Sequence, residues 1–252
     1  MLEIINVSKT YGRKTVVDDV SLCIAKGKLT SFIGPNGAGK STLLSMITQL
    51  TERDSGQIRI DGTEVELYDT NRLARKISLL KQANSLNVRL TVRELVGFGR
   101  FPYSRDRLSK ADIEQVNAAI AYLELETLAG QYLDQLSGGE RQRAFIAMIM
   151  AQNTEYILMD EPLNNLDMKH SVQIMKVLRR MVEQMGKTVV IVIHDINFAS
   201  CYSDEIVALK QGKLVRQGLA ADMIDTDVLR QVYDMDIQIS RLNEQKICNY
   251  FM

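Results

Sequence analysis

The most informative segment of the sequence is Gly34-Pro-Asn-Gly-Ala-Gly-Lys-Ser41, which lies between the β-prone run LTSFI (29–33) and the helical run TLLSMI (42–47). It matches the pattern G-x-x-x-x-G-K-[ST] in full, in the strand–loop–helix context that gives the pattern its meaning. Glycines allow backbone N–H groups to turn inward around phosphates, and the following helix N-terminus adds a positive dipole. The alternative is a glycine-rich turn that matches by chance, and the correct flanks on both sides argue against it.

The expected ligand of this loop is a nucleoside triphosphate. In loops of this kind the lysine, here Lys40, reaches the β- and γ-phosphates, and the hydroxyl of the next residue, Ser41, holds Mg²⁺. The sequence therefore predicts a phosphate-binding site made of Gly34, Pro35, Asn36, Gly37, Ala38, Gly39, Lys40, Ser41 and Thr42.

Two carboxylates follow a short apolar run in the second half of the chain, Tyr156-Ile-Leu-Met-Asp160-Glu161. We expect a central strand whose exit presents Asp160 to Mg²⁺, through water, and Glu161 to the attacking water. An Asp-Glu pair after a strand is a weak signal by itself, because solvated loop carboxylates are common. The pair becomes informative here because the same chain contains a phosphate-binding loop.

The remaining patterns predict an α/β fold. Asp61-Gly62 indicates a hairpin over 57–67, because this dipeptide adopts positive φ at low cost, and the front of the chain is therefore expected to be partly antiparallel. Strand and helix then alternate in the back half, which implies a mostly parallel sheet with helices on both faces. The expected elements are strands 2–7, 16–24, 29–33, 156–159 and 187–193, helices 172–185 and from about 196, and a hairpin over 205–217.

A helical insert is expected between the two halves. Thr91-Val-Arg-Glu94 and Ser109-Lys-Ala-Asp112 both have the form of a helix capping box. We therefore expect a single domain over 1–252, in which 82–135 form a helical subdomain and 1–81 with 136–252 form the catalytic α/β lobe.

Composition limits the classes of function. The 252 residues carry 31 basic and 31 acidic side chains, so the basic excess typical of nucleic-acid binding is absent and no nucleic-acid partner is expected. Cys23, Cys201 and Cys248 form no C-x-x-C pair, which favours reduced thiols. No secretory signal is visible and the apolar runs fall short of the roughly 20 residues of a membrane span, so we expect the chain to be soluble when isolated.

One further motif distinguishes among the families of proteins that contain such a phosphate-binding loop: Leu136-Ser-Gly-Gly-Glu140. Ser137 is expected to cap a helix, Glu140 to close its capping box, and Gly138 and Gly139 to permit close backbone approach. A capped surface helix is the plain alternative. After a complete phosphate-binding loop, however, LSGGE followed by Arg-Gln-Arg resembles the signature of the ABC ATPases, and the family's other motifs occur in the same order over the whole chain.

The resemblance implies roles for further residues. Tyr11 is similar to the aromatic residue that stacks on adenine, and Gln82 to the glutamine that contacts Mg²⁺ and water, although Lys81 stands where the family often has proline. Asp167 ends a loop, Leu163-Asn-Asn-Leu-Asp167, that resembles the one crossing the dimer interface. His194 is similar to the histidine that contacts the γ-phosphate. An ordinary packed tyrosine and a scaffolding histidine are the respective alternatives.

The same resemblance implies partners. In this family ATP lies between the phosphate-binding loop of one subunit and the signature of the other, so a homodimer is expected, with Ser137, Gly138, Gly139 and Glu140 contacting the partner's ATP. The helical insert would transmit motion to integral membrane permease subunits, which would place the chain at the cytoplasmic face of the cell membrane. An extracytoplasmic substrate-binding protein would be an indirect partner.

Subfamily is indicated by Thr91-Val-Arg-Glu-Leu-Val-Gly-Phe-Gly-Arg-Phe-Pro-Tyr103, which resembles ATPases of ferric-siderophore, haem and cobalamin importers. Iron(III)-siderophore import is the expected function, with haem, cobalamin or another metal chelate as the alternative cargo. Two other classes stay open: a non-transport ABC ATPase acting on DNA or ribosomes, and a regulatory nucleotide-binding module without turnover.

Overall fold

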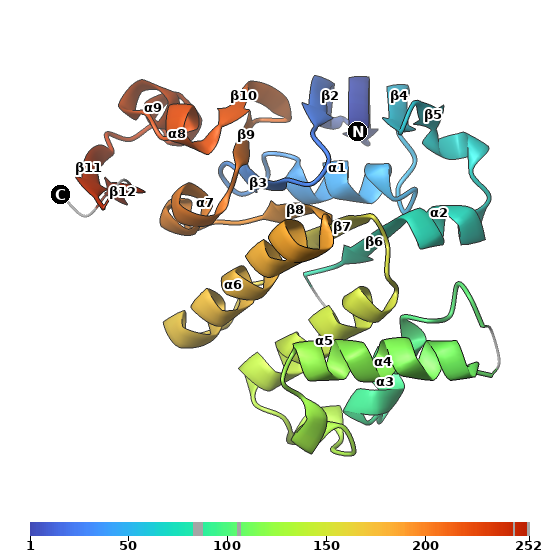
Figure 1. The fold of residues 1–252 in the computed structure, drawn as a ribbon. Coiled ribbons are helices and arrows are strands. Elements are labelled where there is room, and N and C mark those ends of the chain that lie inside the picture. Colours follow the sequence, from blue (N-terminus) through green and yellow to red (C-terminus); the bar gives the residue numbers. More distant parts are fainter. Residues whose placement is uncertain (83–87, 105–106, 244, 251–252) are drawn as a thin grey trace.

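The computed structural model describes residues 1–82, 88–104, 107–243 and 245–250. At its centre lies a six-stranded sheet in the order β10-β9-β3-β8-β7-β6 (Figure 1). Neighbours from β9 to β6 run parallel, and β10 pairs antiparallel at the edge. Every residue of β3 and β8 is buried, as expected for strands covered on both faces. The strands are β3 (Leu29–Ile33), β6 (Ile77–Leu80), β7 (Tyr156–Asp160), β8 (Thr188–Val192), β9 (Glu205–Lys210) and β10 (Lys213–Leu219).

An antiparallel sheet, β2-β1-β4-β5, covers one side of this centre. It contains β1 (Leu2–Tyr11), β2 (Lys14–Ile24), β4 (Ser55–Ile60) and β5 (Thr63–Glu64). The expected turn at Asp61-Gly62 is confirmed, with φ of 53° and 80°. The expectation of a strand as far as residue 67 was wrong: β5 ends at Glu64 and a 3₁₀ turn follows over Val65–Leu67. That turn buries Val65 and leaves Leu67 exposed, where an extended edge strand would find no further partner.

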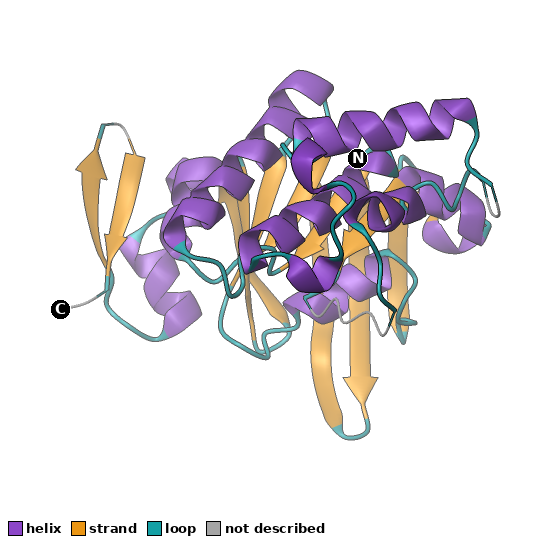
Figure 2. Ribbon diagram, turned by 90° about the horizontal axis from the view of Figure 1, so that it is seen from below, coloured by secondary structure: helices purple, strands orange, loops and turns teal. Residues whose placement is uncertain are grey.

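Helices lie on both faces of the central sheet. Alternate strand residues divide its core: Phe32 and Val190 pack with α1, whereas Ile33 and Val189 pack with the helices of the other face. Figure 2 shows the C-terminal hairpin standing at one side of the molecule. The flanking elements are α1 (Lys40–Ile47), α2 (Thr70–Lys76), α6 (Met168–Met185), α7 (Ile196–Tyr202), α8 (Ala220–Met223), α9 (Thr226–Tyr233), β11 (Gln238–Leu242) and β12 (Gln245–Asn249).

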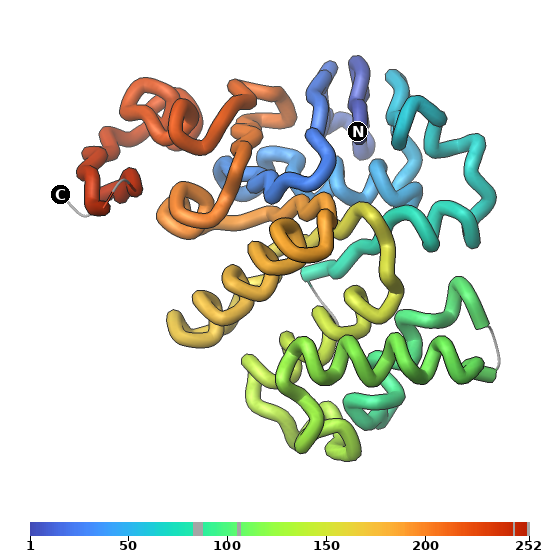
Figure 3. Tube along the Cα trace, viewed as in Figure 1, coloured from blue at the N-terminus to red at the C-terminus, as the bar shows by residue number. Residues whose placement is uncertain are grey.

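A separate group of helices, α3 (Val92–Phe98), α4 (Lys110–Tyr122) and α5 (Gly138–Ala151), packs below the sheet; the Cα trace in Figure 3 shows it in green to yellow. Short 3₁₀ turns at 126–128 and 133–135 join α4 to α5. The expected capping boxes at the starts of α3 and α4 are both present. The buried pair Arg100–Asp112 (2.8 Å) and a hydrogen bond from Arg100 to the carbonyl of Ala151 (2.7 Å) tie the three helices together.

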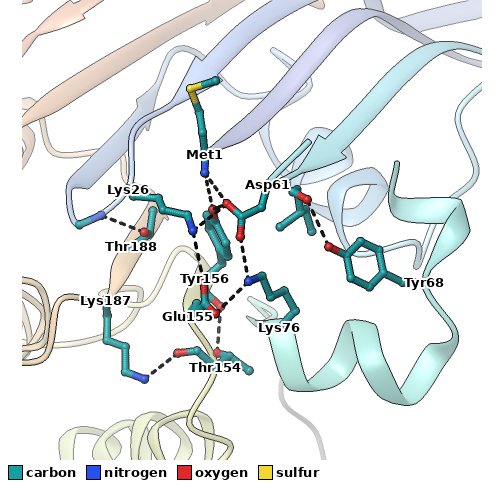
Figure 4. A network of polar contacts seen from close by, with 12 residues as sticks. Met1, Lys26, Asp61, Tyr68, Lys76, Thr154, Glu155, Tyr156, Lys187 and Thr188 are labelled. Carbon is teal, nitrogen blue, oxygen red and sulfur yellow. Dashed lines mark hydrogen bonds and ion pairs between the residues drawn. The ribbon is translucent and has the colours of Figure 1, made fainter. Parts of the chain in front are cut away.

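Asp61 is the centre of a polar network that fixes the start of β7 (Figure 4). Its carboxylate accepts hydrogen bonds from the Tyr156 hydroxyl (2.7 Å) and the Met1 amino group (2.6 Å). Lys26 and Lys76 each lie 2.8 Å from it. These hydrogen bonds hold the pKa of Asp61 well below its usual range against the opposing effect of burial. The network therefore anchors one end of β7, whose other end carries the predicted carboxylates.

Candidate active site

The candidate site lies where the parallel strands β3, β7 and β8 end. Gly34 follows β3, Glu161 follows β7, and His194 comes two residues after β8. Because neighbouring parallel strands finish at the same edge of a sheet, residues far apart in sequence meet there, as is usual for ligand sites in open α/β sheets.

The loop from Gly34 to Ser41 wraps around the side chain of Lys40. The Lys40 ammonium donates hydrogen bonds to the carbonyl groups of Gly34 (2.7 Å) and Pro35 (3.0 Å), and the residue is only 5% exposed. Burial lowers the pKa of Lys40, while Glu161 and Asp160 oppose that shift. Among the described residues, the buried Lys40 ammonium donates hydrogen bonds to neutral carbonyl groups alone. It therefore suits an anionic ligand, because a phosphate would supply the negative charge that a buried cation needs.

Two glycines of the loop are required by its backbone. Gly34 has a φ of 137°, and a Cβ there would collide with the carbonyl oxygen of Leu209. Gly39, at a φ of 95°, is the N-cap residue of α1, and a Cβ there would collide with the carbonyl oxygen of Val16 on β2. The Gly34 N–H donates to the hydroxyl of Tyr233 on α9 (3.1 Å), a contact that no local sequence signal predicts.

Asp160 and Ser41 meet at the start of α1. The Ser41 hydroxyl donates to the Asp160 carboxylate (2.8 Å). Burial raises the pKa of Asp160, helped by Glu161 and opposed by the Ser41 hydrogen bond, Lys40 and His194. A hydroxyl beside a carboxylate is the hard oxygen donor set that Mg²⁺ prefers, so this pair fits the predicted ion.

Glu161 is held from several sides. Its backbone is in the left-handed region (φ 50°) and its N–H donates to the carbonyl of Val192 (3.2 Å). The Gln82 amide donates to one carboxylate oxygen (2.6 Å), and Nε2 of His194 lies 2.6 Å from the other. Asn164 adds a longer hydrogen bond (3.3 Å) and was not singled out from the sequence.

The structure thus brings Gln82, Glu161 and His194 together, as their assigned roles require. Asp195, the residue after His194, is the N-cap residue of α7. Its carboxylate accepts the N–H groups of Asn197 (2.8 Å) and Phe198 (3.3 Å) and thereby caps α7. Its function in the fold is to start that helix.

Tyr11 lies at the end of β1, in the turn toward β2. The ring is half exposed, with the Lys9 ammonium 5.5 Å from its centroid. Val16, a few residues on, is the β2 residue that touches Gly39, so the exposed tyrosine belongs to the segment bordering the phosphate-binding loop.

The signature residues occupy a different face. Ser137 caps α5 and Glu140 completes the capping box, with its carboxylate oxygen accepting both the N–H (2.9 Å) and the hydroxyl (2.6 Å) of Ser137. These hydrogen bonds lower the pKa of Glu140. Because α5 and α1 pack on opposite faces of the central sheet, the signature does not face the loop of its own chain.

Two contacts connect the signature helix to the segment after Glu161. The Gln142 amide donates to the carbonyl of Pro162 (2.9 Å). Gly139 lies against the ring of His170, which in turn lies 2.8 Å from the Asp167 carboxylate. The sequence assigned no function to His170, although its place one turn after Asp167 on α6 was a signal that the two could touch.

Comparison with known proteins agrees with this geometry. Residues 17–164 match the ABC transporter family. The petrobactin import ATP-binding protein YclP of Bacillus subtilis is 60% identical over all of both chains, and FatE of Bacillus anthracis, with the same description, is 47% identical over 95% of this chain and 96% of its own. The dimeric ABC cassette MJ0796 is 34% identical, with a TM-score of 0.78 over 87% of this chain and 99% of its own.

The chain belongs to the ABC transporter family, among its ATP-binding subunits, and is an ATPase of that kind. The family resemblance of the motifs and the expected fold class are therefore confirmed: a P-loop ATPase cassette with a mostly parallel central sheet and an antiparallel N-terminal part. Across the described ranges, no helix combines the length and the apolar character needed to cross a membrane.

Proposed function

We propose that this chain hydrolyses ATP to drive import of an iron(III)-siderophore complex, with ferric petrobactin as the first candidate cargo. The cargo assignment is supported by the printed descriptions of relatives, including the two petrobactin import proteins and an iron(3+)-hydroxamate import protein of Bacillus subtilis at 37% identity. The observation that carries the catalytic part is the Glu161 carboxylate, held by Gln82 and His194 beside the phosphate-binding loop.

Binding of ATP is assigned to the loop and α1. Lys40 and backbone N–H groups of the loop would contact the phosphates, and Tyr11 would stack on the adenine. Ser41, Asp160 and Gln82 would hold Mg²⁺, which supplies positive charge to the phosphate oxygens. The hydrogen bond between Ser41 and Asp160 (2.8 Å) supports this assignment.

Glu161 is assigned the general base. In the closed site its carboxylate would take the proton of the attacking water, while Gln82 and His194 keep that carboxylate oriented. His194 is also assigned the contact with the γ-phosphate that the family resemblance implies. The two hydrogen-bonding groups act on opposite oxygens of Glu161, so the rotation of its carboxylate is restricted.

The complete catalytic unit is assigned to a homodimer. Within one chain the signature and the loop belong to opposite faces of the sheet, so a single copy does not complete its own site and a second copy would complete it. The dimeric relative MJ0796 supports a paired arrangement. Ser137, Gly138, Gly139 and Glu140 would then contact ATP bound by the partner, and Asp167 would lie at the interface.

Residues 82–135 are proposed as the subdomain that engages the permease at the cytoplasmic face of the membrane, with an extracytoplasmic substrate-binding protein as the cargo donor. A cavity of about 450 Å³ on this part is lined by Leu90, Phe98 and Leu108 among others. Phe98 and Phe101 are both more than half exposed there. Such a surface suits a protein partner, because exposed apolar side chains that gather in one patch are typical of interaction sites.

The test uses cells that depend on this chain for iron. Uptake of radioactive iron bound to petrobactin should stop when the native chain is replaced by Glu161→Gln, and return with the native sequence. Membrane fractions from both strains should contain the chain together with a permease. Continued petrobactin uptake with loss of another chelate's uptake would contradict the cargo, and recovery of ribosomes or DNA-binding proteins in place of a permease would contradict transport.

A further inference from the structure

A cavity with an unusual set of unpaired cations lies away from the catalytic residues. It has a volume of about 540 Å³ and is formed by the end of α4, the first turns of α5 and the middle of α6. The wall residues that matter for its chemistry are Tyr122, Glu124, Arg143, Lys176, Arg179 and Arg180. The cavity shares no wall residue with the nucleotide site assigned above.

The charges of this wall do not balance. Arg179 is neutralised, because its guanidinium lies 2.8 Å from Glu183 and 2.9 Å from Asp204. For Arg143, Lys176 and Arg180, the described part of the chain supplies no acidic partner within ion-pair distance. Three cations thus face a cavity that contains one unpaired carboxylate, Glu124.

The hydrogen-bond donors of the wall are incomplete as well. Among the described residues, four shielded side-chain polar atoms have no hydrogen-bond partner, and three of them belong to this wall: Nε of Arg143, Nε of Arg180 and the hydroxyl of Tyr122. Arg180 also lies 5.1 Å from the centroid of the Tyr122 ring, which holds its guanidinium plane in place. Shielded donors normally find a partner, so their concentration around one cavity indicates a missing acceptor.

We propose that this cavity is a binding site for a small phosphate-bearing anion, held between Arg143 on α5 and Arg180 on α6, with Lys176 at its rim. Guanidinium groups present paired N–H donors that match the oxygens of a phosphate, and Tyr122 offers a further hydroxyl. The excess of two positive charges over Glu124 favours a multiply charged phosphate over a single carboxylate.

The location gives such an anion a mechanical consequence. Arg143 belongs to the helical group that packs below the sheet, whereas Arg180 belongs to the helix that covers the sheet. A phosphate bound to both would hold α5 to α6, and would resist any movement of the helical group relative to the catalytic strands. This inference does not depend on the proposed cargo or on dimer formation.

The test measures binding of inorganic phosphate and of pyrophosphate by calorimetry, without Mg²⁺ and at constant ionic strength. The full chain carries Lys40→Ala throughout, so that the loop at 34–41 no longer competes. We expect saturable binding that Arg180→Gln weakens roughly tenfold, because about 1.4 kcal/mol of charged hydrogen bonding is lost. Arg216→Gln is the matched control, since Arg216 is exposed on β10, and it should leave the affinity unchanged.

A second variant is needed because Arg180→Gln could lose binding through misfolding. Lys176 is exposed on α6, and Lys176→Gln should weaken binding several-fold through loss of charge alone. No saturable binding, or equal affinities in Arg180→Gln, Lys176→Gln and Arg216→Gln, would overturn the site. Citrate that binds more tightly than either phosphate would overturn the assignment of the ligand class.

Discussion

The phosphate-binding side and the signature side of this chain differ in how complete they are. Around Lys40, the residues at the ends of β3, β7 and β8 already contact one another, and Glu161 is held from two sides. The signature is also well ordered, with a full capping box, yet Ser137 and Gly138 are exposed and belong to the opposite face of the sheet.

This difference separates two kinds of order. The first side is arranged to hold and hydrolyse a ligand, whereas the second is arranged to be presented to something outside the chain. Contacts of Gln142 with Pro162 and of His170 with Gly139 and Asp167 link them, so a change at the signature can reach the Glu161 segment. We infer that the chain carries two half-sites.

The largest effect is expected at the complete side. Glu161→Gln should lower ATP hydrolysis by roughly 10²–10⁴-fold, because the amide cannot accept the proton of the attacking water. ATP binding should persist, since Lys40 and Ser41 are untouched, and the variant should accumulate as a dimer in ATP. Phosphate release and sedimentation in ATP measure the two effects; rapid hydrolysis by the variant would remove Glu161 from its assigned role.

The next effect addresses the signature side. In Gly139→Ala the new Cβ would sit 2.6 Å from Cγ of His170, so the ring must leave its contact with Asp167. Overpacking of this kind costs about 1–3 kcal/mol, and we expect ATP hydrolysis to fall roughly tenfold or more while ATP affinity of the loop is retained.

The matched control is Gly130→Ala, because a Cβ at Gly130 would meet no atom within 4 Å. Its hydrolysis rate should equal that of the native chain. Adding His170→Ala to Gly139→Ala should restore part of the lost rate if the clash is the cause. Loss of ATP affinity in Gly139→Ala alone would show that the two sides are not separable.

A smaller effect, on stability, is expected at two aspartates, the half-buried Asp160 and the buried Asp112. Burial raises the pKa of Asp160, so its ionised form lowers the free energy of unfolding at neutral pH. This destabilisation disappears as the pH falls below the ordinary pKa of an aspartate in the unfolded chain. Hydrogen bonds from Ser104, Ser109 and Arg100 lower the pKa of Asp112. Its charge therefore stabilises the fold at any pH above the ordinary pKa of an aspartate, and this stabilisation is lost as the pH falls through the lowered pKa of Asp112.

Asp112→Asn should therefore lower the free energy of unfolding by about 3 kcal/mol, since Arg100 keeps a buried charge without its partner. Asp160→Asn should raise the free energy of unfolding or leave it unchanged, and it should abolish ATP hydrolysis. Urea unfolding at neutral pH measures both. A more stable Asp112→Asn would contradict the structural role of that pair.

Local sequence patterns were sufficient for much of this molecule. The phosphate-binding loop, the Asp61-Gly62 turn and the capping boxes each depend on residues within a few positions of one another, and so do the buried strands around them. The site residues Asp160 and Glu161 could be proposed because they follow a short apolar strand, a signal that is complete in six residues.

The remaining features depend on contacts between distant segments. The C-terminal hairpin β11–β12 is held by Asn197 and Ser200 of α7, which bond to the carbonyls of Cys248 (3.2 Å) and Lys246 (2.5 Å), and its strands are too exposed to show a clear period. Tyr233 reaches Gly34 from almost 200 residues away. Pairings of this range leave no trace in local spacing, which is why they were not predicted.

If each catalytic site is built from two copies of the chain, mixing two inactive variants should restore activity. Lys40→Ala lacks a working loop but keeps its signature, whereas Gly139→Ala lacks a working signature but keeps its loop. Mixed dimers would contain one intact site, so equal amounts should recover on the order of a quarter of native hydrolysis, because half of the dimers are mixed and each has one of two sites. A mixture that hydrolyses ATP no faster than its separate components would contradict the account.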